Sequence, residues 1–128
     1  MNDEWRRQLK AMNKGPVDLR TGRHAPFSRT ISLPGDLTGA TLAGQVRLYP
    51  DQGGAALVAF TVGALAVVSG RTNFTISLTE AQIEALPAAT PGEGAVTLIY
   101  DLLLTPSGGI KEPLWGGHFI VVGGATNV

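Results

Sequence analysis

The sequence predicts an all-β fold, specifically an immunoglobulin-like antiparallel sandwich of about seven or eight strands. In several segments, such as "RTNFTISL", apolar residues recur at every second position, as in half-buried strands. Glycine (17 residues) and proline (8 residues) fall mostly between these segments, where tight turns belong. The 128 residues contain no cysteine, so a hydrophobic core rather than disulfides must hold the domain together.

Charge divides the chain into a predicted basic N-terminal arm, residues 1–25, and a sandwich domain, residues 26–128. The arm holds six basic and three acidic residues, a net +3, and the remainder holds four basic and seven acidic residues, a net −3. The two parts are therefore electrostatic complements, although the net charge of the whole chain is zero.

The first half of the arm has the pattern of a short amphipathic helix. Trp5, Leu9 and Met12 lie at helical spacing, and Gly15 and Pro16 end the pattern. The rest, "VDLRTGRHAP", has too few apolar residues to form a core. So short a helix is marginal on its own, which leaves two predictions: a frayed terminus or an arm that docks on a partner, partly helical or extended.

Two strands are predicted between residues 27 and 49. In "FSRTISL", Phe27, Ile31 and Leu33 share the inner face with Arg29, which is tolerable only at a strand end or a sheet edge. In "TLAGQVRLY" the alternation puts one set of side chains inward and the other outward, the inward set being Leu42, Gly44, Val46 and Leu48 and the outward set Ala43, Gln45, Arg47 and Tyr49. "PGDLTG" and "PDQGG" have turn composition.

The run "AALVAFTVGALAVV", residues 55–68, is too short to span a bilayer and predicts two buried strands with a bend at Gly63. "RTNFTISL" follows, with Phe74, Ile76 and Leu78 on the inner face.

A short helix is predicted after residue 78. Ser77 or Thr79 can cap it, with Glu80 or Gln82 completing a capping box, and Pro87 prevents its continuation. Ile83 and Leu86, three residues apart, can pin one helical turn to the end of the sandwich. We expect this helix to carry the chain from one sheet to the other.

The last three predicted strands follow a Gly/Pro-rich loop. "GAVTLIYDLLL" is apolar on both faces, which predicts a central strand with the Tyr100 ring in the core and its hydroxyl bonded to nearby backbone. "TPSGG" predicts a hairpin turn, "IKEPLW" a return strand in which Pro113 marks an edge or a bulge, and "GHFIVVGG" the final strand.

No residue pattern predicts catalysis, so we expect a non-enzymatic protein without catalytic residues, cofactor or metal. His24 and His118 are far apart in the chain, and Glu80 and Glu84 have the i,i+4 spacing of a solvated helix face. The glycines lack a phosphate-loop context, and no serine lies in G-x-S-x-G. Zero net charge offers no general attraction to nucleic acid or an acidic membrane, and we expect neither as a partner, nor a small-molecule ligand.

Five segments carry a resemblance to a known family, namely "FSRTISL", "DLTGATLAGQVR", "LTEAQIEALP", "YDLLLTPSGG" and "GGHFIVVGG". In this order they resemble a small β-domain of tailed-phage and prophage structural modules, found at the start of upper baseplate and tail-fibre proteins. The resemblance covers residues 26–128 and supplies no catalytic residue. This chain departs from the fibre-type arrangement in having a basic arm before the domain and no shaft after residue 128.

The resemblance implies a virion structural protein, an assembly or adapter component of the tail or baseplate that takes part in fibre attachment. The implied partners are other phage structural proteins and further copies of the chain, and the implied location is the virion, assembled in the bacterial host cytoplasm. The predicted docking residues of the arm are Trp5, Arg6, Arg7, Leu9, Lys10 and Met12. The alternatives are a neck or capsid decoration protein, or a carbohydrate-binding, receptor-binding module that would use Tyr49 and Trp115 as an exposed aromatic surface.

Overall fold

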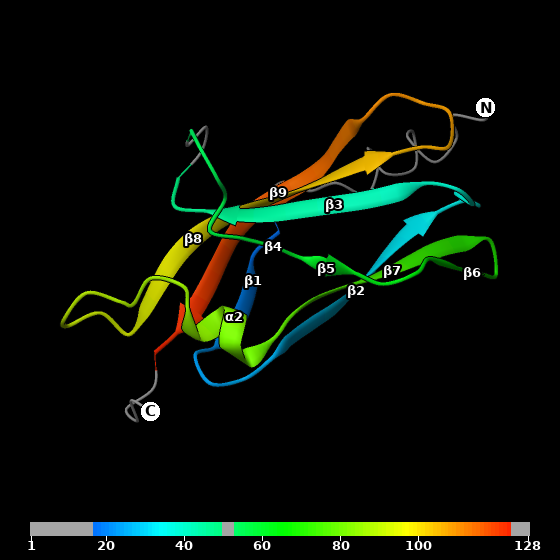
Figure 1. Cartoon of the computed structure of the whole chain (residues 1–128). Coiled ribbons are helices and arrows are strands. Elements are labelled where there is room, and N and C mark those ends of the chain that lie inside the picture. Colours follow the sequence, from blue (N-terminus) through cyan, green and yellow to red (C-terminus); the bar gives the residue numbers. More distant parts are fainter. Residues whose placement is uncertain (1–16, 50–52, 124–128) are drawn as a thin grey trace.

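The computed structural model describes residues 17–49 and 53–123, which form two facing β-sheets (Figure 1). The larger sheet contains, in spatial order, β1 (Leu19–Gly22), β9 (Glu112–Val122), β8 (Ala95–Thr105), β3 (Thr41–Arg47) and β4 (Val58–Ala59). The smaller sheet contains β2 (Phe27–Pro34), β7 (Arg71–Leu78) and β5 (Thr61–Val62), and β6 (Ala66–Val68) also pairs with β7. One helix, α2 (Glu80–Glu84), completes the described part of the chain.

The order of the strands confirms the predicted immunoglobulin-like sandwich. In the lettering of that fold, β2, β7 and β5 with β6 take the places of strands B, E and D, and β3, β8 and β9 those of C, F and G. All strand pairs among the described residues are antiparallel except β1 with β9, which run parallel. The predicted central strand is correct, because β8 lies between β9 and β3.

The chain passes from one sheet to the other at Phe60. β4 ends at Ala59 and pairs with β3, and β5 begins at Thr61 and pairs with β7. Phe60, between them, donates its N–H to the carbonyl of Gly44 and buries its ring in the core. The two sheets are thus joined covalently along this side of the sandwich.

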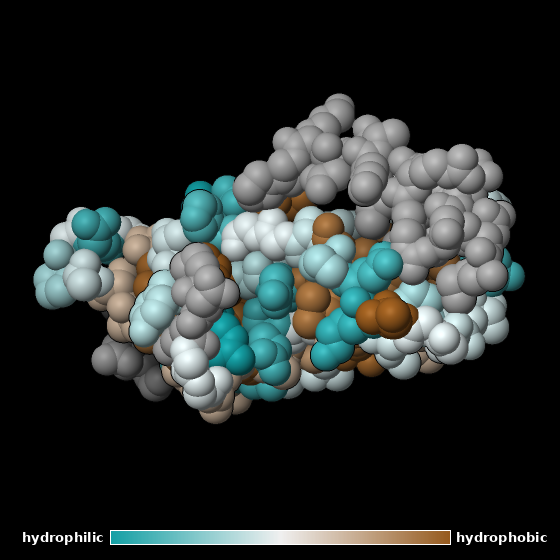
Figure 2. All heavy atoms as spheres, turned by 90° about the horizontal axis from the view of Figure 1, so that it is seen from above, coloured by the Kyte–Doolittle hydropathy of each residue, from teal (hydrophilic) through white to brown (hydrophobic). Residues whose placement is uncertain are grey.

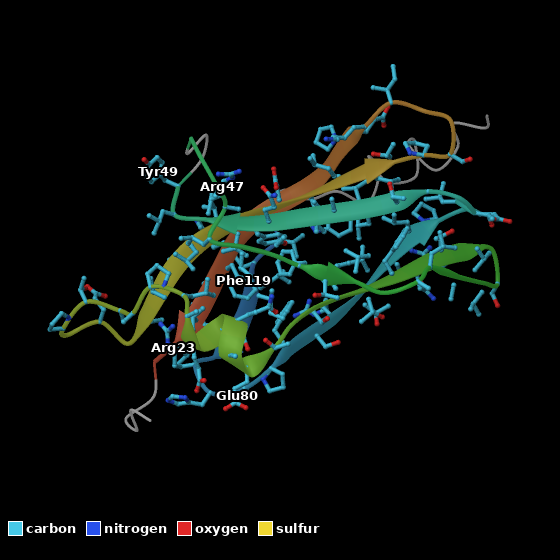
Figure 3. The ribbon with its side chains drawn as sticks, in the orientation of Figure 1. Arg23, Arg47, Tyr49, Glu80 and Phe119 are labelled. Carbon is cyan, nitrogen blue, oxygen red and sulfur yellow. The ribbon has the colours of Figure 1, made fainter. Side chains whose placement is uncertain are left out.

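A single hydrophobic core fills the space between the sheets. Four aromatic rings meet there with centroids 5.2 to 6.1 Å apart and tilted or edge-on geometry, and they belong to Phe27, Phe60, Tyr100 and Phe119. Phe119 is fully buried, and Figure 3 shows its ring between the two sheets. The apolar inner-face residues predicted for β2 and β7, and Leu98, Tyr100, Leu102 and Leu104 of β8, are buried in the same core.

The crossover helix forms as the capping pattern predicts. Thr79 is the N-cap, its hydroxyl accepts from the N–H of Gln82, and the Gln82 side chain accepts from the N–H of Thr79. Ile83 and Leu86 are buried and hold the helix against the end of the sandwich. The helix connects β7 in the smaller sheet to β8 in the larger one, as predicted.

Edge and bulge predictions are also confirmed. Arg29 shares the inner parity of β2, yet it remains exposed because β2 is the edge of its sheet. The predicted return strand and final strand are one strand, β9. Its register with β8 shifts between Asp101 and Leu103, where Leu103 pairs with Pro113. The proline therefore lies directly beside a β-bulge.

Three local predictions are wrong. Residues 17–25 are not part of a separate arm, because β1 pairs with β9 and Leu19 is buried in the core. Leu48 is 43 % exposed because β3 ends one residue before it. The two buried strands predicted in residues 55–68 are not found. The first is divided at Phe60 into the two-residue strands β4 and β5, which belong to different sheets and have no fully buried residue, and the second, β6, lies at a sheet edge with all three side chains exposed.

Candidate functional site

The most elaborate polar site of the described residues fixes the start of the sandwich to β9, and we call it the clasp, formed by Val17, Asp18, Tyr100, Gly117 and His118. The hydroxyl of Tyr100 donates to the carbonyl of Val17 across 2.5 Å. The N–H of Val17 donates to the carbonyl of Gly116. One residue further on, the Asp18 carboxylate accepts from the N–H of His118 at 3.1 Å and lies 3.4 Å from its ring. The backbone of Val17 is therefore bonded to both β8 and β9, and the side chain of Asp18 is bonded to β9.

A glycine allows the two backbones to approach this closely. A Cβ atom at Gly117 would lie 2.3 Å from the carbonyl oxygen of Val17, well inside any real contact. The neighbouring Gly116 is equally tight, with the carbonyl oxygen of Tyr100 at 2.5 Å from a Cβ there. Glycine within a strand commonly marks such a close backbone approach, and here the clasp requires it.

Tyr100 is the one clasp residue that also belongs to the core. Burial raises the pKa of its hydroxyl from 10.0 to about 12. The hydrogen bond from Trp115 opposes this rise, the nearby charge of Asp18 adds to it, and the charge of Arg29 opposes it. The phenol is therefore a neutral donor to Val17 over the whole physiological range.

The raised pKa makes the stability of the sandwich depend on alkaline pH. Above pH 10 the unfolded chain ionises Tyr100 while the folded chain keeps its proton, so the unfolded state binds fewer protons and stability falls as the pH rises. The loss continues until the folded pKa near 12 is reached. We expect urea midpoints measured on both sides of this window to fall less for Tyr100→Phe than for the wild type.

The control for this measurement is Tyr49→Phe, because Tyr49 is 58 % exposed. It should lose as much stability as the wild type between the same two pH values. If Tyr100→Phe and Tyr49→Phe show the same alkaline slope, the buried phenol is not the source of the pH dependence.

A second contact joins the turn between β1 and β2 to the crossover helix. The Arg23 guanidinium donates to the carbonyls of Ile83 and Leu86 at 3.1 and 2.8 Å and to that of Pro87 at 2.8 Å. These carbonyls lie at and beyond the C-terminal end of α2, where helical carbonyls lack partners. Figure 3 shows Arg23 beside the end of the helix, and His24 adds a 2.7 Å contact to Glu84. Arg23, which was predicted to belong to the basic arm, is therefore part of the sandwich domain and bonds the end of its helix.

The predicted site residues are not brought together. The six docking residues of the arm, Trp5, Arg6, Arg7, Leu9, Lys10 and Met12, lie outside the described residues. Tyr49 is exposed and projects from the end of β3, beside Arg47 (Figure 3). Trp115 is instead partly buried, packs against the core and bonds Tyr100. Tyr49 and Trp115 therefore do not share an exposed aromatic surface.

Within residues 17–49 and 53–123, no group of three or more histidine, aspartate or glutamate side chains is placed to hold a metal ion. No helix in that part of the chain is long and apolar enough to cross a membrane. No protein-family model and no curated protein matches the sequence.

The clasp was not predicted as a site, although the sequence contains one signal for it. Two consecutive glycines, Gly116 and Gly117, interrupt an otherwise apolar strand, and this pattern indicates that another backbone lies against them. It does not say which backbone. Which backbone segment lies there depends on the tertiary fold, because Val17 and Tyr100 are 83 positions apart in the sequence.

Proposed function

We propose that the chain is a non-enzymatic structural protein of a tailed-phage virion, an assembly or adapter component of the tail or baseplate in fibre attachment. Residues 1–16 would dock on a neighbouring structural protein, with Trp5, Leu9 and Met12 as apolar anchors and Arg6, Arg7 and Lys10 pairing with acids around them. Attachment at the neck or on the capsid is the alternative position.

The clasp is the observation that best supports this proposal. A buried tyrosine, a pair of glycines and a histidine–aspartate contact all act on two residues, Val17 and Asp18. Immediately before them the sequence changes to the segment with the apolar and basic docking residues. Because the clasp fixes the start of the sandwich, binding of the preceding segment to a partner would also fix the position of the sandwich relative to that partner.

The outer face of the larger sheet is less suited to be the main docking surface. By register, Ile99 of β8 lies between Arg47 and His118, and Asp101 lies between Gln45 and Gly116. Figure 2 looks onto this face and shows hydrophilic and hydrophobic side chains interspersed where grey atoms do not cover it. The carbohydrate-binding alternative also lacks support, because Trp115 packs against the core.

The test measures binding of the full chain to the tail and baseplate proteins encoded beside it. Replacing Trp5, Leu9 and Met12 together with alanine should weaken that binding about a hundredfold, because three buried apolar anchors are lost. The change is confined to residues before the clasp, because a deletion that extended to residue 25 would remove β1. Thermal unfolding should be unchanged.

Ile110→Ala is the matched control, since Ile110 is an apolar residue that is 83 % exposed in the β8–β9 turn. It should bind as the wild type does. Equal affinity of the triple variant and the wild type for every neighbouring protein would contradict docking through residues 1–16.

A further inference from the structure

The two open sides of the sandwich differ in charge. On one side, the edge strands β1 and β2 carry Arg20 and Arg29, and β2 ends at Pro34. On the other side run β4, β5 and β6, and residues 53–70 include no Asp, Glu, Lys or Arg. Charged residues and prolines on edge strands are a common means by which sheets avoid pairing with other chains. The side formed by residues 53–70, which we call the uncharged edge, lacks this protection.

Exposed apolar side chains lie at the β6 end of the uncharged edge. Val67 is 39 % and Val68 is 56 % exposed, and Ala66 is exposed as well. Figure 1 shows β4, β5 and β6 following one another along one side of the sandwich. The edge therefore combines unpaired strand backbone with apolar side chains.

The hairpin between β6 and β7 determines which backbone groups of β6 point outward. Ser69 and Gly70 both have positive φ, 50° and 75°, and connect the paired residues Val68 and Arg71 in a two-residue turn. The residues that flank such a turn exchange hydrogen bonds, and the next pair along an antiparallel ladder does not. Val67, opposite Thr72, therefore directs its N–H and C=O away from β7. Among the described residues, neither group has a partner.

We propose that the uncharged edge is the surface on which a second copy of this chain docks, with β6 of one copy antiparallel to β6 of the other. Val67 would lie opposite Val67 on a two-fold axis, and the two residues would exchange a reciprocal pair of N–H···O=C bonds. The smaller sheets of the two copies would then form one continuous sheet.

Two observations favour a second copy over an unlike partner. An edge without charge has no electrostatic pattern with which to select a different protein, and antiparallel pairing of identical apolar strands needs none. The net charge of the chain is zero, so copies do not repel one another at neutral pH. This pairing deepens the proposed structural role by naming where copies meet, and it depends on residues other than those of the N-terminal segment.

The test is the mass of the full chain by sedimentation equilibrium over a range of concentrations. We expect the wild type to move from one 13.3 kDa copy to two as the concentration rises. Val67→Pro removes the outward N–H without removing a β6–β7 bond, and should weaken self-association about tenfold or more, since two bonds are lost per dimer. Val67→Lys, which adds a charge to the edge, should have at least the same effect if the proline variant does not fold.

Thr30→Lys is the matched control, because Thr30 is an exposed residue on β2, the opposite edge of the same sheet. It should associate as the wild type does. A wild type that stays monomeric at every concentration, or that associates equally well with Val67→Lys, overturns the proposal. The Trp5, Leu9 and Met12 variant should still form dimers, so failure of N-terminal docking and failure of edge pairing are separate results.

Discussion

Replacing Phe119 with alanine is expected to lower the free energy of unfolding by about 3 to 5 kcal/mol, the range found when a buried phenylalanine is truncated. Phe119 is fully buried, and its ring lies 5.2 Å from that of Phe27 and 5.9 Å from that of Phe60. These three rings come from β9, from β2 and from the point where the chain changes sheets. Truncation therefore removes contacts to both sheets at once, and the cavity cannot collapse without moving one against the other.

Urea unfolding followed by tryptophan fluorescence measures this loss. Tyr49→Ala serves as the control, because the side chain is 58 % exposed and its removal should change stability by less than about 0.5 kcal/mol. A loss below about 1 kcal/mol for Phe119→Ala would mean that the rings do not form a shared, tightly packed group.

Replacing Gly117 with alanine is expected to destabilise the sandwich by about 3 kcal/mol, the upper end of the usual range for inserting a methyl group into a closely packed site. The added Cβ would overlap the carbonyl oxygen of Val17, which is the acceptor of the Tyr100 hydroxyl. The residue after it, His118, holds Asp18. The methyl group must therefore displace Val17 and break the clasp.

Gly22→Ala is the matched control, because Gly22 belongs to the same β1–β9 pair and has no heavy atom within 4 Å of an added Cβ. Hydrogen exchange should show faster exchange of the Val17 and β1 amides in Gly117→Ala only. Equal stability of the two variants would show that Val17 and β9 are not in close contact in solution.

Much of the sandwich can be predicted from the sequence because its long strands have one face inward and one outward. In β7 the buried Phe74, Ile76 and Leu78 alternate with polar residues, and a period of two admits only one arrangement of faces. The crossover helix is predicted for a similar reason, since the capping bonds between Thr79 and Gln82 are local. Features determined by neighbours in the sequence are therefore recovered.

The strands that were mispredicted depend on neighbours far away in the chain. β1 contributes one fully buried residue, Leu19, so alternation is not visible, and its position comes from parallel pairing with β9 a hundred residues later. In residues 55–68 a uniformly apolar pattern does not reveal that Phe60 is the one residue buried in the core while β6 stays exposed at the edge. Hydrophobicity without periodicity cannot distinguish a buried strand from an exposed one.

The candidate site was less predictable than the fold for the same reason. The position of the Tyr100 ring in the core follows from parity, and its hydroxyl does bond to backbone as predicted, but the acceptor is Val17. Trp115 was expected to be exposed, yet it is partly buried and packs against the core beside the register shift, where it and Leu114 lie opposite Leu102. Bulges change side-chain direction locally, and the sequence signals one only through Pro113.

The parallel pairing of β1 and β9 determines how the domain responds to mechanical load. The two strands begin at the same end, so tension applied between Val17 and Gly123 pulls them in opposite directions along their length. Leu19, Arg20, Thr21 and Gly22 must then slide past Phe119, Ile120, Val121 and Val122 together, rather than separate one pair at a time as in a peeled hairpin. Such a shear geometry resists traction at the ends of the chain without any increase in thermodynamic stability.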